Sequence, residues 1–482
     1  MTQQTKWGQF GTLVIVFFFW GFVAASNDIL IPVFKKAFDL SQFQSQLVAI
    51  AFYVAYTVGS IIYFVISKTI GGDLLNKIGY KNGIAIGLII SAIGTLLFYP
   101  AANSASFTLM LAGLFIVALG FSLQQIAANP LAIVIGDPKT GSQRLSMAGG
   151  VNNFGTTIGP LLVSFAIFGS VSSGSTTASI ESVKIPYLIL GAAFILVAVF
   201  FKLSTIPNKI DLEEVAAEEA DNSSKVLHKT SVFQYPQLWL GMIGIFVYVG
   251  VEVATASNLP EYMKHHLGVS TDKVAPFVSL YWASLMMGRW TASVGAFDIS
   301  AGLKKVLNFL MPYLAFGVFL LVNAIAQHDV KQFFVYGFVI LAMIGGDILS
   351  KGSPARMLLI FSAMGIIALV IGMLTTGMVS VFAFISVGLF CSTLWPCIFT
   401  LAVAGLGKYT NQGSSLLIMM IMGGGLIAGL QGLLASDNLL GIQASYIVGV
   451  ACFAYLAFYA IRAKGILKSQ GIDYDVKTSG GH

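Results

Sequence analysis

Apolar runs about as long as a bilayer is thick recur along almost the whole chain. A hydrocarbon core of roughly 30 Å needs about 20 apolar residues in a helix to cross it. Fourteen such runs can be counted, and 332–349 is among the shortest. They lie at 11–31, 46–66, 83–100, 107–133, 145–169, 186–203, 238–259, 274–297, 304–326, 332–349, 356–376, 379–406, 413–434 and 442–463. The sequence therefore predicts an all-α polytopic membrane protein with 14 transmembrane helices.

Charged residues are scarce. They make up only 10% of the 482 residues, whereas a soluble domain carries about 25%. This deficit excludes an ordinary soluble enzyme, a disordered chain and a nucleic-acid-binding protein. The three cysteines lie inside apolar runs, so we predict no disulfide framework and no metal site. The sequence contains no P-loop and no HExxH motif, and we predict no cofactor.

The basic residues indicate an orientation. If the N-terminus is cytoplasmic and every run crosses, 20 of the 26 Lys and Arg side chains fall on the cytoplasmic side, as the positive-inside rule requires. We therefore expect a multi-pass protein of the inner (plasma) membrane with both termini in the cytoplasm.

Weak internal matches suggest two parallel halves. Gly21 corresponds to Gly250 in the first helix of each half, and Gly155 corresponds to Gly424 in a later helix. The spacing between matched residues grows by about 40 residues, the length of two helices at about 20 residues per span. We therefore predict an extra helical hairpin at about 304–349. The expected organisation is a six-helix bundle at 1–203, a polar cytoplasmic linker at 204–236, a second bundle with the hairpin at 237–463, and a cytoplasmic tail at 464–482.

Two carboxylates lie inside apolar runs. Asp28 is in the first run, and Glu252 is in the first run of the second half. A charge in hydrocarbon costs about 2.5–3.5 kcal/mol on insertion scales, so such groups usually face a polar cavity on an ion or substrate pathway. The alternative is a structural hydrogen bond between helices. We assign Asp28 as the main cation-coupling residue and Glu252 as the second, whereas Asp298 and Asp347 lie near helix ends and are assigned no role.

Amide and Trp side chains recur along several runs. In the first run Trp20, Asn27 and Asp28 share one helical stripe. An indole ring stacks on the C–H faces of a sugar, and amides exchange hydrogen bonds with its hydroxyls. A single polar residue in a membrane helix more often binds a neighbouring helix, so the repetition favours a sugar site more than any one residue does. The expected sugar contacts are Trp20, Asn27, Gln125, Asn129, Asn152, Trp395 and Gln431.

The segment 72–81 has glycine near both ends and basic residues between them. We predict that it forms a short cytoplasmic turn that latches a gate. The expected gating residues are Gly72, Asn76, Lys77, Gly79 and Arg289. The segment resembles the signature between helices 2 and 3 of the major facilitator superfamily, although Asn76 stands where an Asp is usual there and Tyr80 where an Arg is usual.

Further segments resemble the fucose/glucose/galactose permeases, the sugar–proton symporter branch of that superfamily. They are 19–22, 27–32, 127–130, 152–155, 248–252, 288–290 and 412–414. The resemblance implies two six-helix bundles that rock about a central site and import a hexose by cation symport. It also implies a role in proton coupling and sugar binding for the acid matching Asp28. Gln125 stands where the fucose transporters carry a second acid, which favours the glucose/galactose-type subgroup.

Several alternatives stay open from the sequence. The coupling ion could be sodium, the sugar could be fucose or an amino sugar, and the chain could be an exporter or a membrane sensor that does not transport. A polytopic enzyme is disfavoured because no nucleophile set, metal cluster or large aqueous domain is visible. The expected partners are a sugar, a proton or sodium ion and the lipid bilayer, and we expect a monomer.

Overall fold

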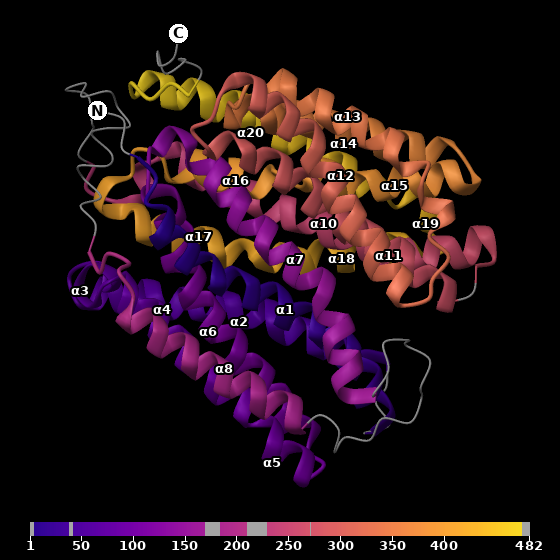
Figure 1. The fold of residues 1–482 in the computed structure, drawn as a ribbon, viewed down its shortest axis with the longest axis horizontal. Coiled ribbons are helices and arrows are strands. Elements are labelled where there is room, and N and C mark those ends of the chain that lie inside the picture. The colour runs from indigo at the N-terminus through magenta and orange to yellow at the C-terminus, as the bar shows by residue number, and fades with distance from the viewer. Residues whose placement is uncertain (1–3, 38–41, 169–183, 210–228, 270, 475–482) are drawn as a thin grey trace.

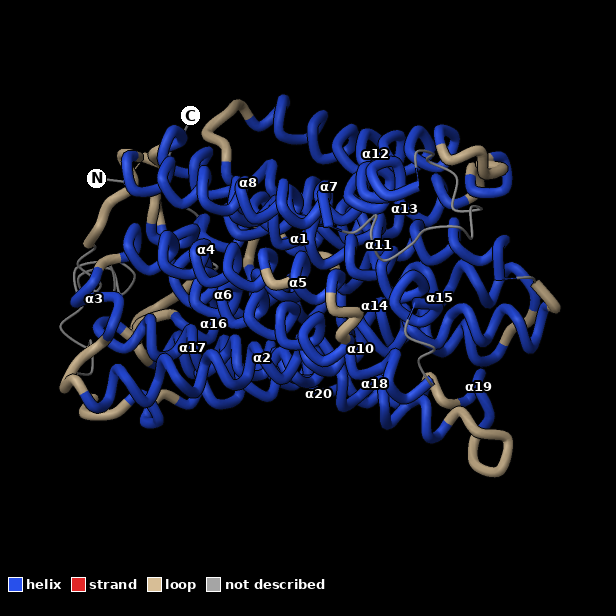
Figure 2. The backbone as a smooth tube through the Cα atoms, turned by 90° about the horizontal axis from the view of Figure 1, so that it is seen from below, coloured by secondary structure: helices blue, strands red, loops and turns tan. Residues whose placement is uncertain are grey.

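The computed structural model describes residues 4–37, 42–168, 184–209, 229–269 and 271–474, with side chains described except at 25–49, 160–161, 164–168 and 271–272. All regular secondary structure in these ranges is helical (Figure 2). The first half contains α1 (Trp7–Ala37), α2 (Gln42–Thr69), α3 (Leu74–Ile78), α4 (Tyr80–Leu96), α5 (Phe98–Asn103), α6 (Phe107–Val134), η1 (Pro138–Thr140), α7 (Gly141–Phe168) and α8 (Lys184–Leu203). The second half contains η3 (Val232–Gln234), α10 (Pro236–Leu267), α11 (Thr271–Ser293), η4 (Val294–Ala296), α12 (Ala301–Ile325), η5 (Lys331–Phe333), α13 (Tyr336–Ser350), α14 (Pro354–Leu374), α15 (Gly377–Cys391), α16 (Leu394–Val403), η6 (Gly407–Tyr409), α17 (Thr410–Met419), η7 (Met420–Met422), α18 (Gly423–Leu434), α19 (Gly441–Ala444) and α20 (Ile447–Ser469).

The prediction of an all-helical membrane protein is confirmed. Each predicted apolar run coincides with one helix or with consecutive helices. Twelve helical segments among the described residues are long and apolar enough to cross a membrane. The long helices α7 and α11 are outside this set, so the count of fourteen spans stays a prediction. These two helices carry polar side chains such as Asn152, Asn153 and Arg289, and they pack against each other between the two halves.

Each half is held together by its own helix pairs. In the first half α1 packs along α7 and α4 along α6, and in the second half α10 packs along α18 and α14 along α20. Figure 1 shows the indigo and magenta helices α1 to α8 grouped apart from most of the orange and yellow helices. The two groups meet where α7 lies beside α11 and where α2 and α6 lie beside α17.

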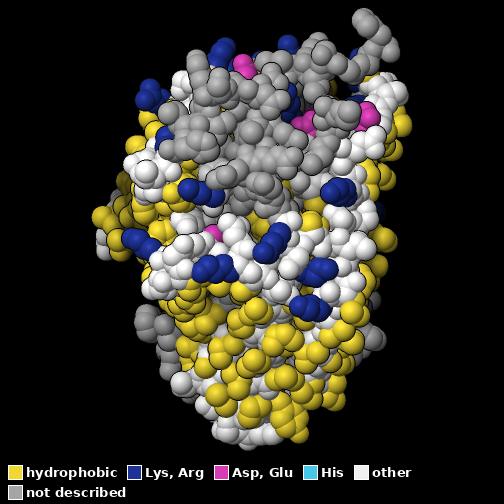
Figure 3. Space-filling model, turned by 90° about the vertical axis from the view of Figure 1, so that its left-hand side faces the viewer, with side chains coloured by type: hydrophobic (Ala, Val, Ile, Leu, Met, Phe, Trp, Pro, Cys, Tyr) yellow, Lys and Arg dark blue, Asp and Glu magenta, His cyan; other side chains and the backbone are white. Residues whose placement is uncertain are grey.

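The outer surface is apolar in the way that lipid requires. Large hydrophobic side chains point outwards from several helices, and Leu203 on α8 is 80% exposed. A helix that is apolar on all sides is typical of a membrane span. Lys and Arg side chains instead gather at the end of the molecule where α1 begins and α20 ends (Figure 3). We call this end the basic end; it includes Lys6, α3 and the α6–α7 connection. Lys6 lies beside that connection, because its backbone amide donates to the Ile135 carbonyl.

Two helices occupy the region 304–349 in which the extra hairpin is predicted. Helices α12 and α13 are joined through η5, and α12 packs on α11 while α13 packs on α14 and α15. Inside the hairpin, Asn308 Nδ2 donates to Asp347 Oδ2 over 3.2 Å. Asp347, which the sequence places near a helix end, is buried. Because its helices pack on α11, α14 and α15, the hairpin lies on the side of the second half, away from the contact between α2 and α17.

Two predicted repeat glycines permit close helix contacts. A Cβ atom at Gly21 would lie 1.9 Å from the carbonyl oxygen of Asn152, and one at Gly250 would lie 2.3 Å from Ile427 Cδ1. Gly21 thus lets α1 approach α7, and Gly250 lets α10 approach α18. The two halves use a glycine at the matching place in their first helices, as the internal repeat predicts.

Candidate functional site

A partly buried acid of the second half, Glu252, is linked to a tyrosine one helical turn before it. Residues four apart on a helix share a face, and the Tyr248 hydroxyl donates to Glu252 Oε2. The same hydroxyl accepts a hydrogen bond of 3.3 Å from Arg289 Nη2 on α11. The Tyr281 hydroxyl, also on α11, donates to the Glu252 carbonyl over 2.8 Å. Tyr248 therefore joins the carboxylate of α10 to the guanidinium of α11.

Arg289 extends this contact into the first half. Its Nη1 donates to Asn153 Oδ1 on α7 over 2.8 Å and to the Gly149 carbonyl over 3.3 Å. Its Nε donates to the Ser392 carbonyl over 2.9 Å. A guanidinium presents five donors in a fixed plane, and four hydrogen bonds are made here by a side chain that is buried. Arg289 thus holds α10, α7 and the α15–α16 junction together.

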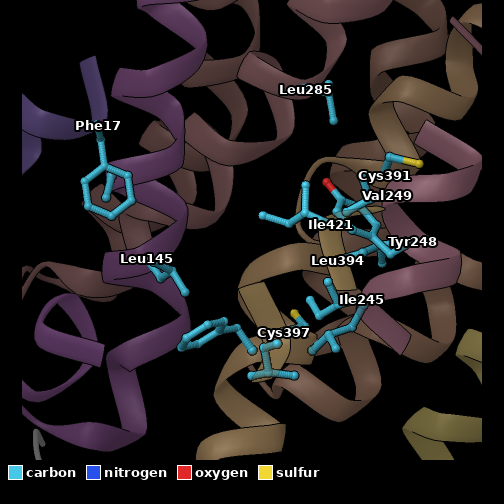
Figure 4. Close-up of a cluster of buried hydrophobic side chains, with 14 of the residues drawn as sticks. Phe17, Leu145, Ile245, Tyr248, Val249, Leu285, Cys391, Leu394, Cys397 and Ile421 are labelled. Carbon is cyan, nitrogen blue, oxygen red and sulfur yellow. The ribbon is translucent and has the colours of Figure 1, made fainter. Parts of the chain in front are cut away.

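Buried hydrophobic side chains lie on both halves of the molecule near Tyr248. Figure 4 shows Phe17 of α1 and Leu145 of α7 on one side, and Tyr248 and Leu394 of the second half on the other. Leu145 and Leu394 are both fully buried. Arg289 and Asn153 are also buried, and hydrogen bonds between buried groups are electrostatically stronger than in water.

Further hydrogen bonds close the two halves at the basic end. Trp290 Nε1 donates to the Gly150 carbonyl over 3.2 Å, and Gln143 Nε2 donates to the Gly352 carbonyl over 3.0 Å. We call the α7–α11 contact and the contact of α17 with α2 and α6 the two seams between the halves. On the second seam, Ser414 Oγ of α17 donates to the Ile126 carbonyl of α6 over 3.0 Å. Both seams therefore carry direct contacts between α7 or α6 and the second half.

The segment 72–81 takes part in the same closure. Asn411 Nδ2, at the start of α17, donates to Asp73 Oδ1 over 3.0 Å and to Asn76 Oδ1 over 3.2 Å. The Tyr80 hydroxyl donates to Asn411 Oδ1 over 2.7 Å. The sequence predicts a turn here, whereas the structure has the short helix α3, because Asp73 caps it by accepting from the Asn76 amide. Asn76 lies at the contact, as expected of a gating residue.

The other predicted residues of this segment shape it without crossing the seam. Gly79 has φ +88°, a conformation that favours glycine, and a Cβ atom there would lie 2.2 Å from Asn208 Oδ1. Lys77 Nζ donates to the Ile70 carbonyl, and a Cβ atom at Gly72 would lie 3.8 Å from Lys77 Cε. These residues keep α3 in place beside α17.

Asp73 is a buried carboxyl group outside the spanning segments. It accepts hydrogen bonds from Asn411, from the Asn76 amide and from the Tyr63 hydroxyl, the last over 2.9 Å. Burial raises the pKa of Asp73, and these hydrogen bonds offset only part of the rise. The closed latch therefore binds a proton at Asp73 more tightly than an opened, hydrated latch would.

This shift predicts a pH dependence of the latch. A carboxyl group whose pKa is raised in the closed state favours closure when protonated, so closure is strengthened as pH falls towards the ordinary carboxyl range near 4 and weakened above the raised pKa. We expect protonation of Asp73 to slow maleimide labelling of Ser414→Cys, which is buried beside the latch, so that the labelling rate at low pH is lower with Asp73 present than in Asp73→Asn. Asp73→Asn has no titratable group at this position, so the effect of Asp73 protonation on the labelling rate is expected to be absent. A Ser414→Cys rate that changes equally with pH in both backgrounds would contradict the role of Asp73.

Amides of the first half form a separate polar group. Trp20 Nε1 donates to Gln124 Oε1 over 2.9 Å, and Gln124 Nε2 donates to Ser91 Oγ over 3.1 Å. Gln125, one residue on, donates to the Tyr56 hydroxyl over 2.9 Å. The predicted residue Trp20 is thus anchored by its indole N–H, while Gln125 pairs with a tyrosine of α2.

Asn129 differs from these amides. It lies one turn after Gln125 on α6 and is 1% exposed, and its Nδ2 has no hydrogen-bond partner among the described residues. An unpaired buried donor costs about 1–3 kcal/mol. Asn129 is therefore the predicted sugar contact with an unused donor.

The remaining predicted contacts are distributed over both halves. Asn152 Nδ2 donates to the Phe17 carbonyl over 3.0 Å and ties α7 to α1. Trp395 lies beside Tyr248, with ring centroids 6.3 Å apart. Gln431 is buried and donates to Ser445 over 3.4 Å, which leaves it outside the Glu252 group. Asn27 and Asp28 belong to α1, but their side chains lie outside the described residues.

Three residues at the site were not singled out as site residues from the sequence. They are Tyr248, Asn153 and Tyr56. Tyr248 carries a signal that could have been used, because it precedes Glu252 by one helical turn. Nothing local distinguishes Asn153 from Asn152, since the two amides point to different helices only after α7 has packed.

The sequence model of the Major Facilitator Superfamily matches residues 10–327. The chain belongs to this superfamily. It is 32% identical over 452 residues to the glucose/galactose transporter of Brucella abortus, covering 93% of this chain and 92% of that protein. It is 31% identical over 464 residues to a putative glucose/galactose transporter of Helicobacter pylori, covering 94% and 96%. The superfamily resemblance and the resemblance to the sugar permease branch are confirmed.

A solved relative shares the fold. The crystal structure of the fucose:proton symporter of Escherichia coli matches with a TM-score of 0.69 and 25% sequence identity, covering 94% of this chain and 98% of that one. The major facilitator fold is therefore confirmed, and the matched relatives are transporters.

Proposed function

We propose that the chain is a secondary active transporter that imports a hexose of the glucose/galactose type by cation symport, with the proton as the coupling ion. The observation that carries the coupling is the partly buried Glu252, whose carboxylate connects through Tyr248 to an arginine that binds the other half. The names of the relatives supply the substrate class. The names of these relatives also disfavour an exporter or a sensor that does not transport.

The basic end faces the cytoplasm in this proposal. Lys and Arg side chains at that end agree with the positive-inside rule, and α1 begins and α20 ends there. The chain sits in the inner membrane with fourteen spans and acts as a monomer. The described state is closed towards the cytoplasm, because the hydrogen bonds of Arg289, Trp290 and Asn411 join the halves at that end.

Two bodies move relative to each other in this mechanism. The two bundles are residues 1–203 and residues 237–463, and the hairpin is attached to the second bundle. The segment 204–236 connects the bundles. The segment 464–482 is a tail that begins within α20. Rocking of the halves opens the central site to one side at a time. Breaking the α7–α11 and α2–α17 seams is the step that opens the site to the cytoplasm.

The proposed roles follow from the placement of each residue. Asp28 is the main cation-coupling residue and Glu252 the second. Asn129 offers an unused donor to a sugar hydroxyl, Trp395 offers an indole face beside Tyr248, and Gln125 is only partly buried. Asn27, Asn152, Trp20 and Gln431 complete the proposed sugar site.

A substrate panel tests the proposed function. Purified protein is heated with glucose, galactose, fucose, an amino sugar or a non-sugar polyol. A ligand that binds only the folded state stabilises it by about 2.7 kcal/mol at one hundred times its dissociation constant, so the aldohexoses are expected to raise the unfolding temperature. Asn129→Ala is expected to reduce that shift and Gly11→Ala, at an open position of α1, to keep it. A shift only with fucose or the amino sugar would reassign the substrate, and no shift with any sugar would contradict the proposal.

A further inference from the structure

We propose that Arg289, Tyr248 and Asn153 form a positioning relay through which cation loading at Glu252 releases the closed cytoplasmic end. The inference deepens the proposed function and rests on it. None of the three residues needs to touch the sugar. Their role is to convert a change of charge at α10 into a change of contact between α11 and α7.

The relay is continuous in the structure. Glu252 accepts from the Tyr248 hydroxyl, that hydroxyl accepts from Arg289 Nη2, and Arg289 Nη1 donates to Asn153 Oδ1. The first three groups belong to the second half, and Asn153 belongs to the first. Three consecutive hydrogen bonds therefore run from the carboxylate to the facing half.

Charge balance gives the relay its direction. Arg289 is buried, and a buried charge is stable only when it is paired and hydrogen-bonded. All four of its hydrogen-bond acceptors are neutral oxygens, so the carboxylate behind Tyr248 supplies the opposite charge. When Glu252 binds a proton or another cation, that compensation is lost and the guanidinium favours a hydrated position. Hydration of Arg289 requires that α11 separate from Gly149 and Asn153 on α7.

Other titratable groups face Glu252 from the elements around it. They are Arg289 and Tyr281 from α11, Cys391 from α15 and Tyr248 from its own helix. Arg289 is the cation of this set, and the others are neutral in their ordinary form near neutral pH. The balance between Glu252 and Arg289 therefore decides the local charge.

The coupling has the sign that an importer needs. A deprotonated Glu252 keeps the cytoplasmic end closed, and a loaded Glu252 permits it to open. Cation binding from outside thus promotes release inside. Trp290 crosses the same seam to the Gly150 carbonyl but makes no hydrogen bond to the relay, so it supplies a matched control that weakens the seam without changing its charge.

A spin-label distance measurement tests the relay. Lys139→Cys on η1 and Lys305→Cys on α12 place labels on opposite halves at the basic end, and the three native cysteines are buried. Pulsed electron paramagnetic resonance on the full chain in nanodiscs reports the ratio of long to short distances. We expect this ratio to rise at least about fivefold from pH 8 to pH 5, the low end of ordinary coupling between sites. The series is repeated in Asp73→Asn, because titration of Asp73 acts in the opposite direction.

The variants separate a relay from a merely structural seam. In the Asp73→Asn background, Glu252→Gln is expected to hold the long distance at every pH, with the response to acid lost. Asn153→Ala and Tyr248→Phe are expected to flatten the pH response as well, whereas Trp290→Phe raises the long fraction evenly and keeps the response. Retained pH dependence in Glu252→Gln, or its loss in Trp290→Phe, would overturn the proposal.

The test is independent of transport. It needs no sugar and no gradient, so a chain that fails to accumulate sugar would contradict the proposed function and leave the distance result readable. A chain that accumulates sugar but shows the same pH response with and without Glu252 would contradict the relay alone. Thermal unfolding of each variant verifies that the labelled protein is folded.

Discussion

Proteoliposomes containing the Asp28→Asn chain are expected to equilibrate the sugar but not to accumulate it. Asparagine keeps the size and polarity of the side chain but binds no proton, so the imposed gradient is no longer coupled to the sugar. One charge moved through 100 mV is worth about 2.3 kcal/mol, which corresponds to roughly 50-fold accumulation. The expected change is therefore from about 50-fold accumulation to none, measured as the internal to external ratio of labelled hexose.

A matched control isolates the membrane acid. Asp298→Asn removes an exposed carboxylate from the connection between η4 and α12 at the basic end and is expected to accumulate sugar normally. Counterflow without a gradient checks that the Asp28→Asn chain still moves sugar. Uphill accumulation by Asp28→Asn at the level of the unsubstituted chain would contradict its coupling role and move that role to Glu252.

Arg289→Ala is expected to have the second largest effect. The change leaves Asn153 Oδ1, the Tyr248 hydroxyl and two carbonyl oxygens without their donor at a buried contact. Breaking a buried charge pair costs about 3–5 kcal/mol, and 3 kcal/mol changes a conformational equilibrium by about 150-fold. We therefore expect the closed state to be depleted and uptake to fall by about two orders of magnitude.

The conservative replacement sharpens this expectation. Lysine keeps the charge but lacks the planar fork that reaches α7, α10 and the α15–α16 junction together, so Arg289→Lys is expected to recover little uptake. Arg462→Ala, which removes an exposed basic side chain on α20, is the control and is expected to transport normally. Full uptake by Arg289→Lys would show that charge alone is required and would contradict the geometric role.

The helices could be predicted because their signals are local, and the acids are singled out by an equally local signal. A run of apolar residues as long as the bilayer is thick specifies a helix wherever it occurs, and a carboxylate such as Glu252 inside a run is costly unless it is used. The helices α12 and α13 lie in the region 304–349 that the repeat spacing predicts as an inserted hairpin. Each of these inferences needs only one stretch of sequence or one comparison of spacing.

The partners of individual side chains could not be predicted because they depend on packing between distant segments. Arg289 was expected at the gate, but its partner Asn153 is far from it in sequence and was passed over in favour of Asn152. Trp20 was expected to stack on a sugar, while its indole N–H is bound to Gln124. Which side of α7 or α1 meets which neighbour is fixed by close contacts such as that at Gly21, and these appear only in three dimensions.

Gradient-driven hexose uptake by the reconstituted, unsubstituted chain tests cation-coupled sugar transport most directly. Labelled glucose or galactose is supplied outside the liposomes, with an inward proton gradient, an inward sodium gradient or neither. We predict accumulation above the external concentration with the proton gradient and equilibration without one. Accumulation with sodium alone would replace the coupling ion, and a sugar level that never exceeds equilibrium under either gradient would contradict symport.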